Sequence, residues 1–182
     1  MTASALIDAD GRHAGAVWVP SPNFDQRPEN SRIELLVIHN ISLPPGEFGG
    51  PWIDALFQNR LDPDAHPYFR EIAALEVSAH FLIRRDGELR QYVSTDDRAW
   101  HAGVSRWKER ERCNDFSIGV ELEGADDVPF AEHQYECLAA LTRALFERYG
   151  KLDLAGHSDI APERKTDPGP WFDWGRFHAS VA

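Results

Sequence analysis

The stretch IELLVIHN, residues 33–40, decides the fold class of this 182-residue chain. Its β-branched and other apolar residues follow one another closely, which is typical of a central strand in a sheet. The segment SLPPGEFGGP, residues 42–51, ends this strand sharply because glycine and proline favour turns. Pro51 then opens a short predicted helix in WIDALFQNR, residues 52–60, since proline is tolerated at the first helical position.

The rest of the chain adds a hairpin, a strand and two helices. LEVSAHFLIRRDGELRQYV, residues 75–93, predicts a hairpin whose turn is Asp86–Gly87. FSIGVELEG, residues 116–124, predicts a second strand, and EHQYECLAALTRALFERYG, residues 132–150, predicts a helix with apolar residues at helical spacing. A last short helix is expected in WFDWGRFHAS, residues 171–180. We therefore predict a mixed α/β domain, with a central β-sheet flanked by helices.

Two further segments lack strong periodicity. Residues 1–32 are interpreted as an N-terminal arm that packs on the body through Trp18 and Phe24, since SPNFDQRPENS is polar and rich in proline and asparagine. Residues 152–170 are predicted to be mostly loop. Residues 33–182 then form one domain, which suits a chain of this length.

Composition excludes several classes of protein. The formal net charge of −11 argues against a nucleic-acid partner, because phosphate binding needs a basic face. No apolar run approaches the roughly 20 residues of a membrane helix, and Asp8 and Asp10 stand where an export signal would be apolar. Cys113 and Cys137 form no CxxC motif and suit a reducing compartment. We therefore expect a cytoplasmic protein with no membrane or nucleic-acid partner. We also expect a monomer, although the sequence itself does not give the oligomeric state.

Eight histidines offer possible metal ligands. No HExxH pair and no zinc-finger spacing occurs, so any metal site must combine distant segments. His39 ends the first predicted strand, at the kind of strand end where ligands bind in α/β sheets. The sequence leaves two alternatives open for His39, a metal ligand or a histidine that caps the strand by hydrogen bonding.

His157 and Asp167 lie in a second candidate segment, GHSDIAPERKTDPGP. Pro168 favours extended geometry at Asp167 and so fixes the direction of its carboxylate. Lys165 stands two residues before Asp167, and in an extended chain both side chains face the same cleft. The alternative is an exposed turn with a surface ion pair.

Glu121 shares one face of the second predicted strand with Gly119. A carboxylate beside a glycine indicates a place where a ligand approaches, whereas the alternative is a solvent-facing strand residue. Two imidazoles and one carboxylate, from His39, His157 and Asp167, suit a zinc ion with one open coordination position.

Such a zinc site would hydrolyse an amide or an ester. Zinc lowers the pKa of its bound water to about 7, which gives hydroxide near neutral pH. Glu121 would take the proton of the water and pass it to a leaving nitrogen. Lys165 would stabilise the negative oxygen of the tetrahedral intermediate.

Five blocks follow one another along the chain: IELLVIHNISLPPGEFGGPWID, VSAHFLIRRDGELRQYV, RAWHAGVS, RERCNDFSIGVELEG and GHSDIAPERKTDPGP. Together they resemble the type 2 N-acetylmuramoyl-L-alanine amidases, and more narrowly the AmpD-type 1,6-anhydro-N-acetylmuramoyl-L-alanine amidases of bacterial cell-wall recycling. The blocks occur in the order found in the family and cover most of the chain. The resemblance implies the type 2 amidase fold, which peptidoglycan-recognition proteins share, and a zinc amidase domain over residues 33–182.

The resemblance also implies the site residues and the substrate. It makes His39, His157 and Asp167 the zinc ligands. It makes Glu121 the carboxylate that handles the catalytic water and places Lys165 near the scissile carbonyl. The bond cleaved would be the amide between N-acetylmuramic acid, in its 1,6-anhydro form, and L-alanine of the stem peptide, in cytoplasmic murein recycling.

Other side chains are candidates for contact with the substrate. Asn40 would hydrogen bond to its backbone, and Arg112 would grip a carboxylate of the stem peptide unless it forms a surface ion pair. Trp100 would stack on a sugar ring unless it fills the core. His80 and His101 are either groups that support the metal ligands or packed strand residues. We expect His80 to be packed, and the choice for His101 is left open.

Two rival functions belong to other classes. A relative of this fold that has lost a zinc ligand binds peptidoglycan without cleaving it, but the ligand set here is complete. A different zinc hydrolase, such as a deacetylase or an esterase, would use the same chemistry. The products formed from an anhydromuropeptide distinguish these alternatives.

Overall fold

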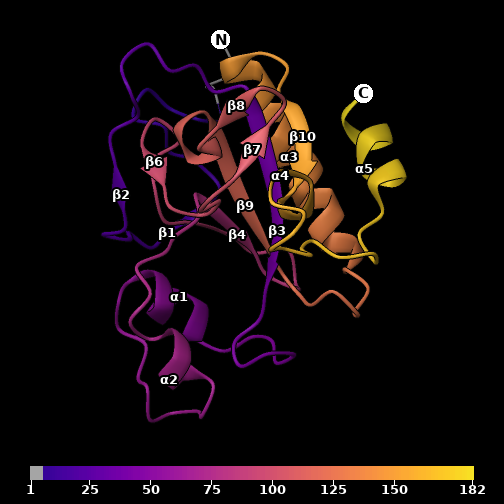
Figure 1. The fold of residues 1–182 in the computed structure, drawn as a ribbon. Helices are drawn as coiled ribbons and strands as arrows, with labels where there is room; N and C mark the ends of the chain where they lie inside the picture. Colours follow the sequence, from indigo (N-terminus) through magenta and orange to yellow (C-terminus); the bar gives the residue numbers. More distant parts are fainter. Residues whose placement is uncertain (1–5) are drawn as a thin grey trace.

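Six strands form the central sheet, in the order β1-β5-β4-β9-β3-β10 (Figure 1). The structure is a computed structural model that describes residues 6–182. The strands are β1 (Val17–Trp18), β2 (Phe24–Asp25), β3 (Leu35–Ile41), β4 (Phe81–Ile83), β5 (Leu89–Gln91), β6 (Arg98–Ala99), β7 (Arg106–Trp107), β8 (Arg110–Glu111), β9 (Ser117–Glu123) and β10 (Asp153–Gly156). The helices are α1 (Trp52–Phe57), α2 (Phe69–Ile72), the 3-10 helix η1 (Cys113–Asp115), α3 (Glu132–Tyr149), α4 (His157–Ile160) and α5 (Trp174–Val181). The predicted mixed α/β class is confirmed.

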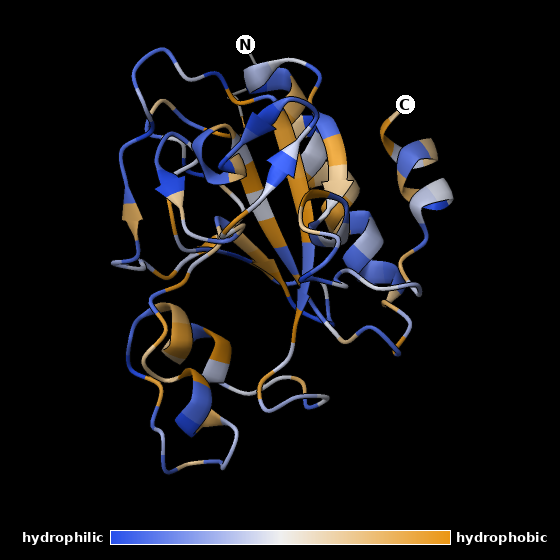
Figure 2. Ribbon diagram, viewed as in Figure 1, coloured by the Kyte–Doolittle hydropathy of each residue, from blue (hydrophilic) through white to orange (hydrophobic). Residues whose placement is uncertain are grey.

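The longest strands of the sheet, β3 and β9, lie side by side in its middle, where burial suits their apolar residues. They run parallel, and their register pairs Leu35 with Ser117 and His39 with Glu121. Figure 2 shows hydrophobic residues along both strands and hydrophilic ones at the end of β3. β4 and β10 are parallel to these strands as well, so the carboxyl ends of all four meet at one edge of the sheet.

Helices α3 and α5 cover one face of the sheet (Figure 1). Leu138, Leu141 and Leu145 of α3 and Phe177 of α5 pack into the core that β3 and β9 form on this face. Among the helices of residues 6–182, none combines the length and the apolar character that crossing a membrane requires. The opposite face of the sheet is covered by short elements and loops, and its residues Leu35 and Val37 pack in a second, smaller core with Phe116.

Most of the predicted elements are confirmed, with one exception. The hairpin appears as β4 and β5, the second strand as β9, and the long helix as α3. The prediction that residues 152–170 are mostly loop holds after Ile160 but misses the regular structure before it, because Asp153–Gly156 forms β10 and α4 follows it directly. Four residues that include aspartate and glycine give no periodic signal, and their strand geometry comes from pairing with β3. This strand positions His157.

The N-terminal arm joins the body through backbone pairing. β1 adds an edge strand beside β5, and β2 pairs with β6. Phe24 is 43% exposed, so the prediction that it holds the arm on the body is wrong. Trp18 is half-buried and lies under the guanidinium of Arg12. The anchor is an arm residue that the sequence did not single out, Arg27.

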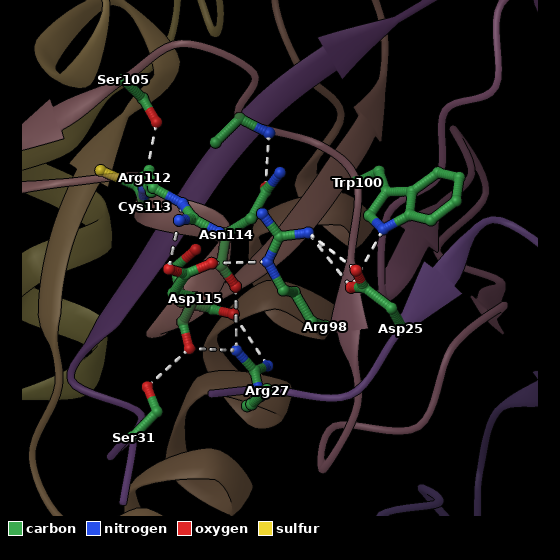
Figure 3. Close-up of polar contacts among 12 residues, drawn as sticks. Asp25, Arg27, Ser31, Arg98, Trp100, Ser105, Arg112, Cys113, Asn114 and Asp115 are labelled. Carbon is green, nitrogen blue, oxygen red and sulfur yellow. Dashed lines mark hydrogen bonds and ion pairs between the residues drawn. The ribbon is translucent and has the colours of Figure 1, made fainter. Parts of the chain in front are cut away.

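Arg27 reaches into the body and donates hydrogen bonds to four main-chain carbonyl groups. These belong to Thr95, Asn114, Asp115 and Ser117, at 2.9–3.2 Å, and Figure 3 shows Arg27 beside Asp115. Burial lowers the pKa of the guanidinium to about 10. Because the four carbonyls come from two separate segments, Arg27 ties the arm to both of them.

Replacing Arg27 by methionine should lower the free energy of unfolding by about 3 kcal/mol, because buried carbonyl groups lose their donor while the apolar stem remains. Urea denaturation followed by circular dichroism measures this change. Arg32, an exposed residue of the same arm, is the matched control, and Arg32→Met should stay within about 0.5 kcal/mol of wild type. Equal midpoints for the two variants would show that Arg27 is not the anchor.

Candidate metal centre

Adjacent parallel strands bring His157, His39 and Glu121 to one level of the sheet. His39 of β3 lies opposite Glu121 of β9 in the register. Gly156, the last residue of β10, lies opposite Ile38, so the next residue, His157, stands beside His39. All three lie toward the carboxyl ends of their strands, which is where parallel α/β sheets bind ligands.

Asp167 reaches this edge from the loop that follows α4. Gly156 lets the loop come close, because a Cβ at this position would lie 2.7 Å from Cδ of Pro168. The side-chain amide of Asn40 donates to the Pro168 carbonyl at 3.0 Å, and the Ser158 N–H donates to the Asp167 carbonyl at 2.9 Å. These contacts hold the carboxylate of Asp167 over the two imidazoles.

The donor atoms of His39, His157 and Asp167 converge. Nδ1 of His39 lies 3.0 Å from both Nδ1 of His157 and Oδ2 of Asp167. Nδ1 of His157 lies 3.2 Å from the same carboxylate oxygen. Ligands of a tetrahedral zinc ion stand about 3.3 Å apart, given metal–nitrogen distances of about 2.0–2.1 Å. The three donors therefore fit a zinc ion and leave one coordination position open.

Hydrogen bonding directs a lone pair toward the point where the donors converge. Nε2 of His157 lies 3.0 Å from the carbonyl oxygen of Ala102, which can only accept, so neutral His157 carries its proton on Nε2. Its Nδ1 then presents a lone pair to His39 and Asp167. Burial lowers the pKa of His39 to about 4, so this imidazole is neutral near pH 7. The lone pair of His157 Nδ1 and the carboxylate of Asp167, 3.2 Å apart, repel one another unless a cation or a proton lies between them.

The two carboxylates of the site differ in their affinity for protons. Burial opposes ionisation of Asp167, but where the His157 and His39 rings carry a proton on Nδ1, their hydrogen bonds outweigh this and hold its pKa well below the ordinary value. Burial, and secondly the charge of Asp167, raise the pKa of Glu121 well above the ordinary value. Glu121 is only 9% exposed, so a solvent-facing position is excluded. Its Oε2 has no hydrogen-bond partner within residues 6–182, which leaves this oxygen free to exchange a proton.

A cavity of about 360 Å³ opens over these groups. Lys165 lines it together with Asp167, as the spacing of the two residues predicted. Much of the remaining wall is apolar and comes from α1, from α2 with the residue before it, and from the segment after α2: Leu56, Phe57, Tyr68, Ile72, Leu75 and Val77. The cavity thus combines a polar end, where the candidate catalytic groups gather, with an apolar wall.

The positions considered for substrate contact are not all in this cavity. Trp100 lines it, and its indole N–H donates to Asp25 of the arm at 3.2 Å (Figure 3). Asn40 also lines it, although its amide group already donates two hydrogen bonds within the protein. Arg112 is exposed and lines a neighbouring hollow, with Nε 3.4 Å from the carboxylate of Asp115 (Figure 3).

His80 and His101 lie behind the candidate ligands. His80 is fully buried, and its Nδ1 accepts a hydrogen bond from the N–H of Gly119, so the prediction of a packed residue is confirmed. Nδ1 of His101 lies 2.9 Å from Nε2 of His39. The sequence gives no sign of this contact, because 62 residues separate the two histidines.

Comparison with known proteins identifies the family. A family model described as N-acetylmuramoyl-L-alanine amidase matches residues 29–170. This range contains every residue that converges on the candidate metal centre. The chain belongs to the N-acetylmuramoyl-L-alanine amidase family.

Relatives within this amidase family are very similar to the chain. The 1,6-anhydro-N-acetylmuramyl-L-alanine amidase AmpD of Escherichia coli (strain K12) is 64% identical over 97% of this chain and 98% of its own. The corresponding AmpD of Enterobacter cloacae is 65% identical over 97% of this chain and 91% of its own. These relatives confirm the resemblance to the AmpD-type amidases.

Solved structures of amidases agree with this assignment. The crystal structure of a Se-Met AmpD derivative superposes with a TM-score of 0.95 and 62% identity, over 97% of this chain and 99% of that one. AmiD of E. coli, solved in complex with anhydro-N-acetylmuramic acid-L-Ala-D-γ-Glu-L-Lys, has a TM-score of 0.60 and 29% identity, over 85% of this chain and 60% of that one. The predicted type 2 amidase fold is confirmed.

Proposed function

We propose that this amidase uses zinc, held by His39, His157 and Asp167, to hydrolyse the amide between 1,6-anhydro-N-acetylmuramic acid and L-alanine of the stem peptide. The observation that carries the proposal is the convergence of three donor atoms within 3.0–3.2 Å of one another, on the sheet level that also carries Glu121. The AmpD relatives support the anhydro sugar as substrate. The setting would be cytoplasmic murein recycling.

Glu121 is the proton carrier in this proposal. When bound, zinc supplies Lewis-acid activation of water and of the scissile carbonyl. Glu121 takes the proton of the attacking water, because its Oε2 is free of other hydrogen bonds. Its raised pKa lets the carboxyl hold that proton and then deliver it to the leaving nitrogen of L-alanine.

The remaining candidates bind the substrate or stabilise charge. The ammonium group of Lys165 stabilises the negative charge that develops on the carbonyl oxygen. Trp100 stacks on the sugar ring at the wall of the cavity, and Asn40 accepts a hydrogen bond through its side-chain oxygen. Arg112, which pairs with Asp115 at the surface, exchanges this partner for a carboxylate of the stem peptide at the neighbouring hollow.

We propose further that the amidase acts as a monomer, without a membrane or nucleic-acid partner. Residues 33–182 would form the zinc amidase domain, on which the arm of residues 1–32 packs. A module that only binds peptidoglycan is disfavoured, because the donor set, Glu121 and Lys165 are all present.

Digestion of a defined anhydromuropeptide tests the function. Enzyme loaded with zinc should release a free peptide that begins with L-alanine, together with anhydro-N-acetylmuramic acid, and mass analysis identifies both. Removal of the metal with a chelator should abolish the cleavage, and added zinc should restore it. A non-anhydro muropeptide serves as the matched substrate. An intact amide bond in zinc-loaded enzyme, or loss of only an acetyl group, would overturn the proposal.

Lys165→Met should lower kcat by about 10² while zinc affinity stays close to wild type, because the side chain acts on charge that develops during the reaction. Steady-state kinetics and a zinc titration on the same preparation check both expectations. Lys151→Met removes an exposed lysine outside the cavity and is the matched control. A kcat for Lys165→Met equal to that of the control would remove Lys165 from the catalytic set.

A further inference from the structure

His101 makes a hydrogen-bonded chain with His39 that ends on a buried serine. Nδ1 of His101 lies 2.9 Å from Nε2 of His39, and Nε2 of His101 lies 3.1 Å from Oγ of Ser117. The rings of His101 and His39 meet edge to face, with centroids 5.1 Å apart. Both nitrogens of His101 are therefore engaged, one with a candidate zinc ligand and the other with the strand beneath.

The surroundings of His101 are built to hold its ring in this place. The ring lies directly over Gly119, where a Cβ would come within 2.5–2.7 Å of three ring atoms. The main-chain N–H of His101 donates to Oδ1 of Asn114 at 3.2 Å. Gly119 and Ser117 are alternate residues of β9, so they point to the same face as Glu121 and His39. Any larger residue at position 119 would displace the imidazole from His39.

The chain of hydrogen bonds has two possible directions, and only one is compatible with a metal. If Ser117 donated to His101 and His101 to His39, the proton of neutral His39 would sit on Nδ1, the atom that faces His157 and Asp167. In the other direction, Nε2–H of His39 donates to His101 and Nε2–H of His101 donates to Ser117. The lone pair of His39 Nδ1 then points to the converging donors.

We propose that His101 is a positioning residue, which accepts the Nε2 proton of His39 and so fixes this ligand in the tautomer and orientation that bind zinc. The inference rests on the metal site of the proposed function and adds to it a residue that does not touch the metal. Groups that orient a metal-bound histidine typically change metal affinity by about 10- to 100-fold when they are removed.

Two substitutions of His101 separate the effect of its hydrogen bond to His39 from the effect of its packing. His101→Leu keeps bulk but removes the acceptor, whereas His101→Asn places an amide oxygen where Nδ1 stood but leaves a larger hole. We expect His101→Leu to lower zinc affinity by about 10- to 100-fold and His101→Asn to lose clearly less. Ser117→Ala removes only the last acceptor and should cause a smaller loss in the same direction.

The measurement is a zinc titration of metal-stripped protein against a chromophoric chelator, together with the visible spectrum of the cobalt-substituted protein. The spectrum reports ligand geometry and should change in His101→Leu. His133→Ala, an exposed histidine on α3, is the control and should match wild type in both readouts. Circular dichroism of the metal-free proteins shows which variants are folded, and Ser117→Ala decides the question if His101→Leu is not.

The inference would be overturned if His101→Leu kept the zinc affinity and the cobalt spectrum of the wild type. If His101→Leu does not fold, the same result in Ser117→Ala would overturn it. A larger loss for His101→Asn than for His101→Leu would do the same, because it would show that the ring only fills space. If wild-type protein binds no zinc, the proposed function fails as a whole. If it binds zinc and these variants bind it equally well, only the role of His101 fails.

Discussion

Asp167→Ala is expected to abolish turnover and to lower zinc affinity by more than about 100-fold, beyond the range for groups that only orient a ligand. The carboxylate is the single negative charge among the three converging donors, and its oxygen lies 3.0 Å and 3.2 Å from the two imidazole nitrogens. Without the Asp167 carboxylate, only two neutral imidazoles would bind the divalent cation, and the attraction between opposite charges would be lost. Chelator competition measures the affinity, and release of L-alanyl peptide measures the turnover.

Asp127→Ala is the matched control for this experiment. Asp127 is an exposed acidic residue in the hollow next to the site, so its removal changes the net charge equally. The zinc affinity and the kcat of Asp127→Ala should stay near the wild-type values. Full activity of metal-stripped Asp167→Ala would be fatal to the ligand assignment.

Glu121→Gln is expected to keep the metal and to lose kcat by about 10² or more, which is the usual contribution of a general base. Glutamine has the shape of glutamate, so the buried site should stay packed, but its amide cannot take the proton of a water molecule. Zinc titration and steady-state kinetics on one preparation separate the two effects.

Asp167→Ala and Glu121→Gln together distinguish a metal ligand from a general base, because the first should lose zinc and the second should lose only turnover. Asp167→Ala should fail to bind zinc, and an excess of zinc should recover part of its metal content. Glu121→Gln should bind zinc normally and stay slow at any zinc concentration. If Glu121→Gln turned over like wild type, the water would have to be activated by another group.

The sequence predicted the middle of the sheet and the polar residues of the site, but not every element that positions them. β3 and β9 carry continuous apolar residues, so their character is local and could be recognised. β10 has four residues and becomes a strand only through pairing with β3. His157 was therefore expected in a loop, whereas it stands immediately after a strand.

The sequence alone could not decide between the alternatives for His39 and Glu121, because the choice depends on which side chains lie near them in the folded structure. A strand-end histidine either caps or coordinates, and only the neighbouring Nδ1 of His157 and the carboxylate of Asp167 favour coordination. Glu121 would face solvent on an edge strand. Segments outside the sheet, including the one that carries His101, cover this face of β9, so Glu121 is buried instead.

Arg27 had no signal in the sequence, and the sequence could not decide the role of His101. An arginine in a polar, proline-rich arm is normally exposed, and its burial depends on carbonyl groups about 70 to 90 residues away along the chain. His101 depends on the space above Gly119, which is a property of the facing strand.

The three candidate ligands stand on parts of the chain that differ in burial. His39 and His157 are 1% and 3% exposed, and they belong to or adjoin strands of the central sheet, whereas Asp167 comes from a loop with exposed residues on both sides. Segments with few buried contacts open locally at lower free energy than the core does. In the proposed zinc site, Asp167 is therefore the ligand that we expect to dissociate first, and local opening of the segment 161–168 would set how long a bound ion stays. Stiffening that segment would slow metal exchange while the chemistry at the sheet stays the same.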